Sequence, residues 1–358
     1  MKAAEVHVTE RYKTSSSIGI NIEAEASVTR VQAAIVAGSE KDPNINYTEY
    51  VQKHSVCDAK GSYTLAFDFL KPESIYTIYV LAYDENGLPT GLKSLTCSTG
   101  AVADDPFTVT TTHVGTTTLK YNVTAKDASV KYCTFATGYD YYQRWQLEEG
   151  TNGDVIKHFI SMWSTFASWY GENWQTMMKY DRREGTYEGD GYHLMWDARQ
   201  VVITFGMDDD GNLVTPIQVD SIHTNAPTPV DMDIPVTVLS NEWGDQQIKA
   251  APTTNTPYFI TMQPAAYVDL YKTDAALLRA LCYEADNINP TWPVLATRTS
   301  EMVCGSSACA RMSIPTTTSS LSDWTRAHPL PAPSRPRSRC LEEVSKPIVC
   351  TTTKEEKQ

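Results

Sequence analysis

Residues 70–99 restrict the fold of this chain more than any other stretch. Large or apolar side chains recur at every second position, which is typical of a β-strand: Tyr76, Ile78, Val80 and Ala82. One face of such a strand is buried, and the other meets water or a second layer. Residues 84–87 then supply a turn sequence, and residues 90–99 read as the returning strand. The stretch therefore predicts an antiparallel hairpin.

The residues ahead of this strand follow the pattern Leu-x-Pro-x-Ser-x-Tyr from Leu70 to Tyr76. This pattern resembles the penultimate strand of a fibronectin type III module, whose tyrosine corner bonds its hydroxyl to upstream backbone. The resemblance implies that Tyr76 forms such a corner. An unrelated antiparallel hairpin is the alternative, because many folds share this alternation.

The same plan returns 124 residues later, which predicts a duplicated module. The positions that match without a gap are Leu70 with Leu194, Ala82 with Gly206, Asp84 with Asp208, and Gly87 with Gly211. One position departs from the pattern, because Gln200 stands where the first module has Tyr76. We therefore expect a mainly β chain of tandem fibronectin type III-like (immunoglobulin-like) sandwiches, the second without a corner tyrosine.

Four segments follow from this interpretation. Residues 1–101 form the first module, residues 102–226 the second, and residues 227–303 a partial third. In the third we expect strands at 235–239, 247–251 and 258–262 and a helix over 274–286. The second module carries a helical insertion at about 139–191. Within the first module, residues 48–53 of a polar loop are expected to form one helical turn.

Residues 304–358 form an irregular tail with a different character. The tail has a net charge of +3, whereas the rest of the chain carries −16. It is rich in proline and has no hydrophobic period. Our hypothesis is that it arises from a shifted reading frame or a misjoined segment; the alternative is an ordinary disordered linker.

The insertion contains the most informative aromatic residues of the chain. Apolar side chains recur at spacings of three and four between Val155 and Met178, which predicts an amphipathic helix. Asn152 or Asp154 would cap its start, and Gly171 would divide it in two. Trp145 lies before this helix, and we expect its ring to be exposed.

Four tryptophans are candidate ligand-binding residues, because exposed rings can stack on the faces of sugars: Trp145, Trp163, Trp169 and Trp174. The competing interpretation is burial. An aromatic stripe at helical spacing usually packs into a core, and here it would seal one face of the sandwich.

The sequence argues against several other functions. A net charge of −13 disfavours nucleic acid and anionic membrane surfaces as partners, and no apolar stretch is long enough to cross a bilayer. No catalytic motif appears, and the insertion carboxylates have no fixed separation: Glu148, Glu149, Glu172, Glu184, Glu188 and Asp190.

We expect no cofactor and no metal. Residues 208–212 read as a hairpin turn and not as a calcium loop, and the tail residues Cys304, Cys309, His328 and Cys340 have poor zinc spacing. Cys57 and Cys97 could pair, but the sequence leaves this open.

Arrays of such modules with inserted helices resemble surface lipoproteins of Bacteroidota-type bacteria. The resemblance implies an extracellular or cell-surface protein whose leader peptide is absent from this chain. We expect a non-catalytic spacer, adhesin or binding scaffold, with a surface glycan or another protein as partner. The alternatives are a carbohydrate-binding module that uses the insertion aromatics and an accessory fragment of a modular hydrolase.

Overall fold

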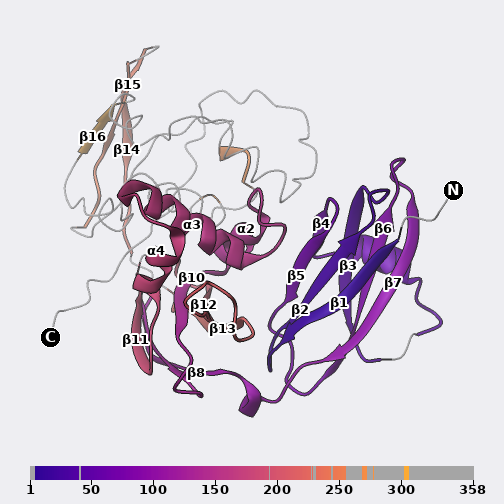
Figure 1. Ribbon diagram of the computed structural model, residues 1–358. Coiled ribbons are helices and arrows are strands. Elements are labelled where there is room, and N and C mark those ends of the chain that lie inside the picture. The colour runs from indigo at the N-terminus through magenta and orange to yellow at the C-terminus, as the bar shows by residue number, and fades with distance from the viewer. Residues whose placement is uncertain are drawn as a thin grey trace. The chain divides into compact units, whose positions relative to one another are not determined.

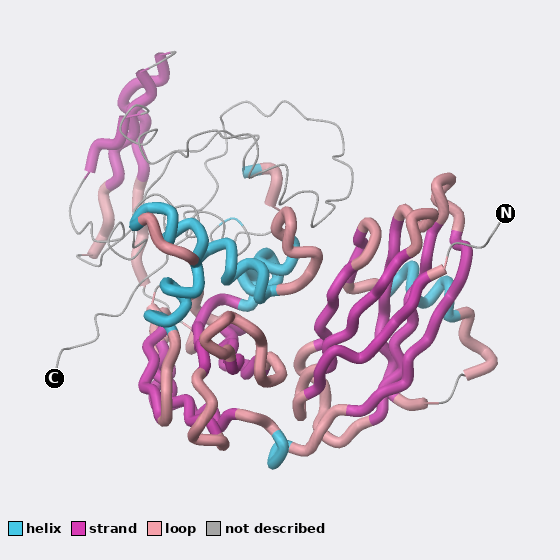
Figure 2. Tube along the Cα trace, in the orientation of Figure 1, coloured by secondary structure: helices cyan, strands magenta, loops and turns pink. Residues whose placement is uncertain are grey.

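The computed structural model describes residues 5–39, 42–192, 194–226, 228, 231–242, 245–254, 268–271, 277 and 302–305. The chain divides into two compact units, one of residues 1–194 and 198–224 and one of residues 195–197 and 225–358. Strands dominate the described part, and the helices lie in a few connections between them (Figures 1 and 2).

The first unit begins with a two-sheet sandwich. One sheet has the order β1-β2-β5 and the other β4-β3-β6-β7, and the neighbouring strands in both sheets are antiparallel. Their bounds are β1 Val6–Lys13, β2 Ile18–Ala24, β3 Arg30–Ala37, β4 Cys57–Ala59, β5 Tyr63–Phe67, β6 Ile75–Tyr83 and β7 Pro89–Ser98. Alternate side chains of β2 and β6, such as Ile20 and Ile78, meet in the core between the sheets.

Tyr76 forms the predicted tyrosine corner at the start of β6. The backbone N–H of Lys71 donates a hydrogen bond of 2.9 Å to the Tyr76 hydroxyl. The ring itself is buried in the sandwich core. The hydroxyl therefore fixes the chain that leads into the central strand.

A second sandwich repeats this plan. Its sheets have the orders β11-β9-β8 and β10-β12-β13, so that β10-β12-β13 corresponds to β3-β6-β7. The bounds are β8 Phe107–Val114, β9 Leu119–Ala125, β10 Tyr132–Gly138, β11 Thr186–Gly191, β12 Arg199–Gly206 and β13 Gln218–His223. Strand β12 begins 124 residues after β6, which confirms the predicted tandem sandwiches.

The two hairpin turns confirm the repeat at the level of single hydrogen bonds. The Asp84 carboxylate accepts from the backbone N–H groups of Asn86 and Leu88. The Asp208 carboxylate accepts from those of Asp210 and Asn212. These bonds hold residues 208–212 as a turn, as the sequence predicts.

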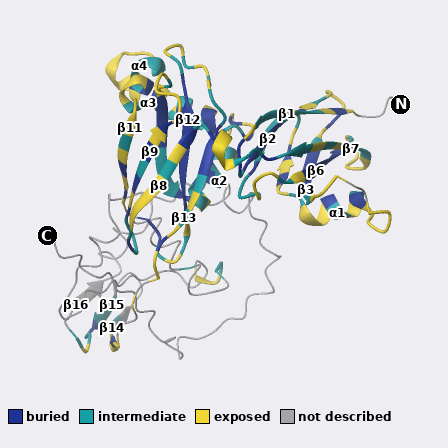
Figure 3. Cartoon of the chain, turned by 90° about the horizontal axis from the view of Figure 1, so that it is seen from below, coloured by how far each residue is buried: buried dark blue, intermediate teal, exposed yellow. Residues whose placement is uncertain are grey.

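Helices cover the outer face of the same sheet in both sandwiches. Helix α1 (Tyr47–His54) follows β3, and its Tyr47 stacks on Tyr79 of β6 with ring centroids 4.3 Å apart. Helices α2 (Tyr139–Leu147), α3 (Val155–Tyr170) and α4 (Trp174–Asp181) follow β10, the strand that corresponds to β3. Strands β6 and β12 are consequently buried on both faces from their second residue onward (Figure 3).

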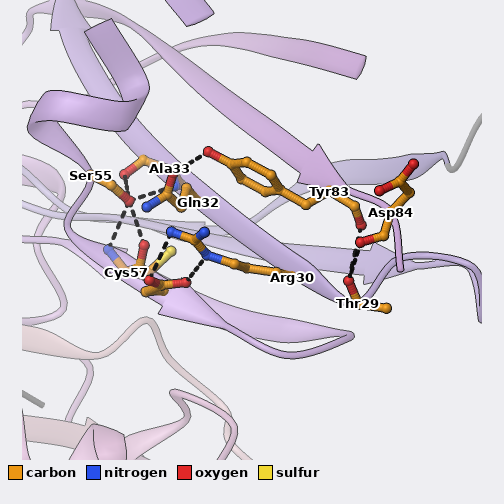
Figure 4. A network of polar contacts seen from close by, with 9 residues as sticks. Thr29, Arg30, Gln32, Ala33, Ser55, Cys57, Tyr83 and Asp84 are labelled. Atoms are coloured by element: carbon orange, nitrogen blue, oxygen red, sulfur yellow. Dashed lines mark hydrogen bonds and ion pairs between the residues drawn. The ribbon is translucent and has the colours of Figure 1, made fainter. Parts of the chain in front are cut away.

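Polar contacts fix the short edge strand β4 in the first sandwich. Arg30 makes a two-point contact with Asp58, and its guanidinium lies 4.6 Å from the centre of the Tyr83 ring (Figure 4). The Tyr83 hydroxyl donates to the side-chain carbonyl of Gln32. This network lies on the same outer face as α1.

The cysteines of the first unit are free thiols. Cys57, Cys97 and Cys133 form no disulfide, which settles the Cys57–Cys97 pairing that the sequence leaves open. Burial raises the pKa of the Cys57 thiol to about 12. These thiols are consequently protonated at neutral pH.

The second unit contains a three-stranded sheet of order β14-β15-β16. Strands β14 (Val236–Glu242) and β15 (Asp245–Ala250) overlap the strands predicted at 235–239 and 247–251. Strand β16 (Met302–Gly305) pairs with β15. Its last two residues, 304 and 305, belong to the predicted tail. The strand predicted at 258–262 and residues 306–358 lie outside the described residues, as does the helix predicted at 274–286 apart from residue 277.

Candidate functional site

The helical insertion begins and ends where its capping residues predict. The Asp154 carboxylate accepts from the Ile156 N–H at the start of α3, and Gly171 ends the helix with a φ of 69°. Asn173 caps α4 by accepting from the Thr176 N–H. The predicted helix and its division are confirmed, whereas α2 has no counterpart in the prediction.

Two of the candidate tryptophans belong to the core of the insertion. Trp163 is 1% exposed, and its Nε1–H donates to the Asp181 carboxylate at 2.7 Å. The half-buried Trp174 stacks on Trp163 with ring centroids 6.3 Å apart, and its ring lies against Gly211. Trp163 therefore has no face open to a ligand.

Trp145 lies before α3, as predicted, but on a helix of its own, and its ring is less exposed than the sequence suggests. Its half-buried ring stacks on His158 with centroids 4.5 Å apart and meets the edge of Phe159. The His158 Nδ1 lies 2.6 Å from a Glu148 carboxylate oxygen. Trp145 thus packs α2 against α3.

The remaining candidate, Trp169, is exposed at the end of α3. It is 69% exposed, and its neighbours Phe166 and Tyr170 are 41% and 73% exposed. The rings of Phe166 and Trp169 meet edge to face with centroids 5.3 Å apart. We call these three residues the aromatic end of α3. No charged side chain interrupts α3 from residue 159 to 170.

Polar contacts join the first sandwich to the insertion. We call these contacts, together with the linker described below, the joint. The Asp68 carboxylate accepts from the Ser17 hydroxyl at 2.7 Å and from the Tyr142 hydroxyl of α2 at 3.1 Å. On β1, the Arg11 guanidinium pairs with Asp154 at 2.9 Å, so one carboxylate caps α3 and holds the neighbouring sandwich.

Gly153 permits the closest approach of backbone within the joint. The Thr64 N–H of β5 donates to the Asn152 carbonyl at 2.8 Å. A Cβ atom at Gly153 would lie 1.8 Å from the Thr64 carbonyl oxygen, and the φ of Gly153 is +83°. Only glycine is compatible with both conditions.

The linker between the sandwiches is bonded at both ends. It passes through the short turn η1 (Val102–Asp104), after which the Asp105 carboxylate accepts from the N–H and hydroxyl of Ser15. The Phe107 N–H donates to the Gln218 side chain at 3.1 Å, and Gln218 in turn donates to Asp220 at 2.9 Å. The linker therefore connects β1–β2 of one sandwich with β13 of the next.

Two of the insertion carboxylates have partners of opposite or potentially opposite charge. Glu148 lies beside His158, and Glu184 pairs with Lys131 at 3.1 Å. Within the described ranges, no group of three or more His, Cys, Asp or Glu side chains could hold a metal ion. In the described part of the chain, none of the helices combines the length and apolarity needed to cross a membrane.

Sequence reasoning missed the residues of the joint. Asp68, Asp105 and Gly153 belong to no periodic pattern and no known motif. Asp154 was identified as a possible cap, but its partner Arg11 lies 143 residues away. Long-range contacts of this kind leave no signal in the local sequence.

Comparisons with known proteins give only distant likenesses. No protein-family model matches the sequence, and no curated protein matches it. Among solved structures, the central fibronectin-III array of RIM-binding protein is 8% identical, with 71% of this chain and 82% of that chain covered and a TM-score of 0.20.

Two further structures have similar scores. A two-domain fibronectin type III segment of chicken tenascin is 11% identical, with 62% and 98% coverage and a TM-score of 0.20. A family 28 exopolygalacturonase of Yersinia enterocolitica is 16% identical over 28% of this chain and 20% of its own, with a TM-score of 0.19. The assignment of fibronectin type III-like sandwiches rests on the strand order, the register and the tyrosine corner.

Proposed function

We propose that this chain is a non-catalytic modular protein that holds a binding face at a fixed distance and orientation. The joint is the observation that carries the proposal. Hydrogen bonds and an ion pair connect the first sandwich to the linker and to the insertion of the second, and these contacts would make the two sandwiches move as one body. We place the modules at residues 1–101, 102–226 and 227–303.

Spin-label distances test the fixed orientation. Labels on non-natural amino acids at exposed positions of the two sandwiches, in the full chain, are expected to give one narrow distance distribution. Cutting the Arg11 contact with Arg11→Ala should broaden it, because one anchor of the joint is lost. A broad distribution in the unaltered protein would refute the spacer proposal.

We also propose a location at the cell surface. This follows from the resemblance to surface lipoproteins, and it implies that the native chain carries a leader. Treating intact source cells with a protease tests it, because a surface protein is degraded while an internal control protein survives. Survival of both proteins would contradict the location.

A second candidate function is binding of a neutral glycan, and the aromatic end of α3 favours it. Taking ~200 Å² for each ring, the exposed aromatic surface is on the order of 350 Å². The largest apolar patch on a typical monomer covers about 300–600 Å² and is often functional. Exposed hydroxyl-bearing side chains lie on α3 close to these rings in sequence: Ser161, Ser164, Thr165 and Ser168.

Glycan-array binding tests this second function. Trp169→Ala should abolish binding to neutral oligosaccharides, because the most prominent stacking ring is removed. Tyr180→Ala on α4 is the matched control, since Tyr180 is 73% exposed and lies outside the aromatic end of α3. Binding that survives Trp169→Ala, or no binding across a broad array, would exclude the glycan function.

A further inference from the structure

The aromatic end of α3 forms a corner that is open to solvent. The Phe166 and Trp169 rings lie nearly perpendicular, with an interplanar angle of 80° and centroids 5.3 Å apart. The edge of one ring therefore meets the face of the other, and a compact group beside them can contact both faces at once. Tyr170 follows directly and is 73% exposed. Such a corner suits a small rounded group better than a flat one.

The chain supplies no basic residue at this end of the helix. Helix α3 has none in its last turn, and no Lys or Arg occurs between Lys157 and Lys179. The carbonyl groups at the end of a helix carry a partial negative charge, which a cation stabilises. Helix α4 starts within three residues of Gly171 and contributes an opposite partial charge, so the neighbouring side chains decide the sign of the field.

Acidic side chains make this field negative. Glu172 is exposed and directly follows the end of α3. The Trp174 ring lies against the turn at residues 208–212, which contains three consecutive aspartates. Arg182 pairs with one of these aspartates, and Lys179 lies near the same one. The turn and Glu172 together therefore keep a net negative charge, which complements a cation.

We propose that the aromatic end of α3 binds a quaternary ammonium group, such as the trimethylammonium group of choline. Rings of Trp, Tyr and Phe attract such cations to their faces. A methylated nitrogen presents apolar surface to the rings and positive charge to Glu172 at the same time. A neutral sugar would use the same rings but would leave the acidic surroundings without a counter-charge.

The same charges identify the source of the ammonium group. In a phosphocholine lipid the ammonium lies next to a phosphate, which Glu172 and the end of α3 would repel. The net charge of −13 adds to this repulsion. The ligand is therefore a small soluble cation without a neighbouring anionic group.

Titration of the full chain with choline tests the proposal. The readout is the indole N–H resonance of Trp169 in a proton–nitrogen NMR spectrum, identified by its absence from Trp169→Ala. Neohexanol, which has carbon in place of the ammonium nitrogen, is the matched neutral ligand, and sodium chloride controls for ionic strength. Each exposed ring should favour the cation about two- to fivefold, so choline should bind about tenfold more tightly than neohexanol. Phosphocholine should bind more weakly than choline.

Variants measured by calorimetry separate the rings from the charge. Trp169→Ala should abolish choline binding, and Phe166→Leu, which keeps an apolar side chain, should weaken it about two- to fivefold. Glu172→Gln should weaken it by up to about fivefold. Tyr180→Ala is the matched control for the rings, and Glu149→Gln, an exposed acid in the loop before α3, is the control for the charge. Both controls should bind choline as the unaltered protein does.

Several results would overturn the proposal. These are the absence of a saturable shift, equal affinities for choline and neohexanol, binding that survives Trp169→Ala, and tighter binding of phosphocholine than of choline. Binding of a neutral oligosaccharide without any response to choline would overturn it and leave the glycan function in place. The test does not depend on the orientation of the sandwiches, so the spacer function and the cation site can fail separately.

Discussion

Substituting Gly153 with alanine should loosen the joint without touching the core of either sandwich. The new Cβ atom would lie 1.8 Å from the Thr64 carbonyl oxygen, and a backbone atom cannot move aside as a flexible side chain can. Gly150 provides a matched control. It lies in the same loop with a φ of +86°, but an added Cβ atom there meets nothing within 4 Å.

The expected loss of stability follows from the contacts that must break in Gly153→Ala. Both variants bear the left-handed backbone penalty of about 1–2 kcal/mol. Gly153→Ala must also break the bond from the Thr64 N–H to Asn152, worth about 1 kcal/mol. It further strains the partly buried contact between Arg11 and Asp154, worth about 1.5–3 kcal/mol. We expect Gly153→Ala to lower the free energy of unfolding by about 2–4 kcal/mol more than Gly150→Ala does.

Thermal unfolding followed by circular dichroism measures the difference. For a body of this size, 1 kcal/mol corresponds to a change in Tm of about 2–4 °C, so the two variants should differ by roughly 5–15 °C. Their far-UV spectra should match that of the unaltered protein at low temperature, since both sandwiches remain folded. Equal losses of Tm in the two variants would refute the close approach at Gly153.

Four further predictions concern single side chains, each measured by urea unfolding. Tyr76→Phe should cost about 1 kcal/mol, because the corner loses the hydrogen bond from upstream backbone. Trp163→Phe should lower the free energy of unfolding by about 2–4 kcal/mol, because its buried hydrogen bond to Asp181 is lost. Trp169→Ala should lower it by less than about 0.5 kcal/mol, because this ring is exposed. Asp220→Asn should stabilise the protein by roughly 1–3 kcal/mol at pH 7.5 and have little effect at pH 4, because burial raises the pKa of Asp220 to about 6 and the folded state therefore binds more protons between about pH 4 and 6. A uniform effect of Asp220→Asn across this range would contradict its raised pKa.

The parts of the fold that could be predicted are those with local causes. The turn at Asp84 forms through hydrogen bonds within five residues. Asp208 has the same position in its own hairpin and makes the same hydrogen bonds. The alternation in β6 and the helical period of α3 reflect the face that each element buries. The spacing of 124 residues between the two modules, which these local features reveal, therefore predicts the position of β12 correctly.

The candidate site could be predicted only in part, because helical spacing does not say which residues face outward at a helix end. Trp163 and Trp169 both follow the apolar spacing, yet Trp163 is buried and Trp169, in the last turn of α3, is exposed. The packing of Trp145 could not be predicted, because α2 is short and its apolar residues have no extended period. Its contact with His158 forms only after α2 and α3 fold together.

The joint explains why the second insertion is so much larger than the first. Both insertions follow the equivalent strand and cover the outer face of the equivalent sheet, and for that task α1, with 8 residues and about 12 Å of length, is sufficient. The second insertion also supplies Tyr142 on α2 and Asp154 at the start of α3, which contact the preceding sandwich. Covering a sheet requires an apolar stripe, whereas holding a neighbour requires polar groups beyond that stripe. A longer insertion can meet both requirements, because it supplies the Tyr142 hydroxyl and the Asp154 carboxylate in addition to the apolar side chains that α2 and α3 bury. The orientation of the two sandwiches is therefore a property of the insertion and the linker together, and neither sandwich determines it alone.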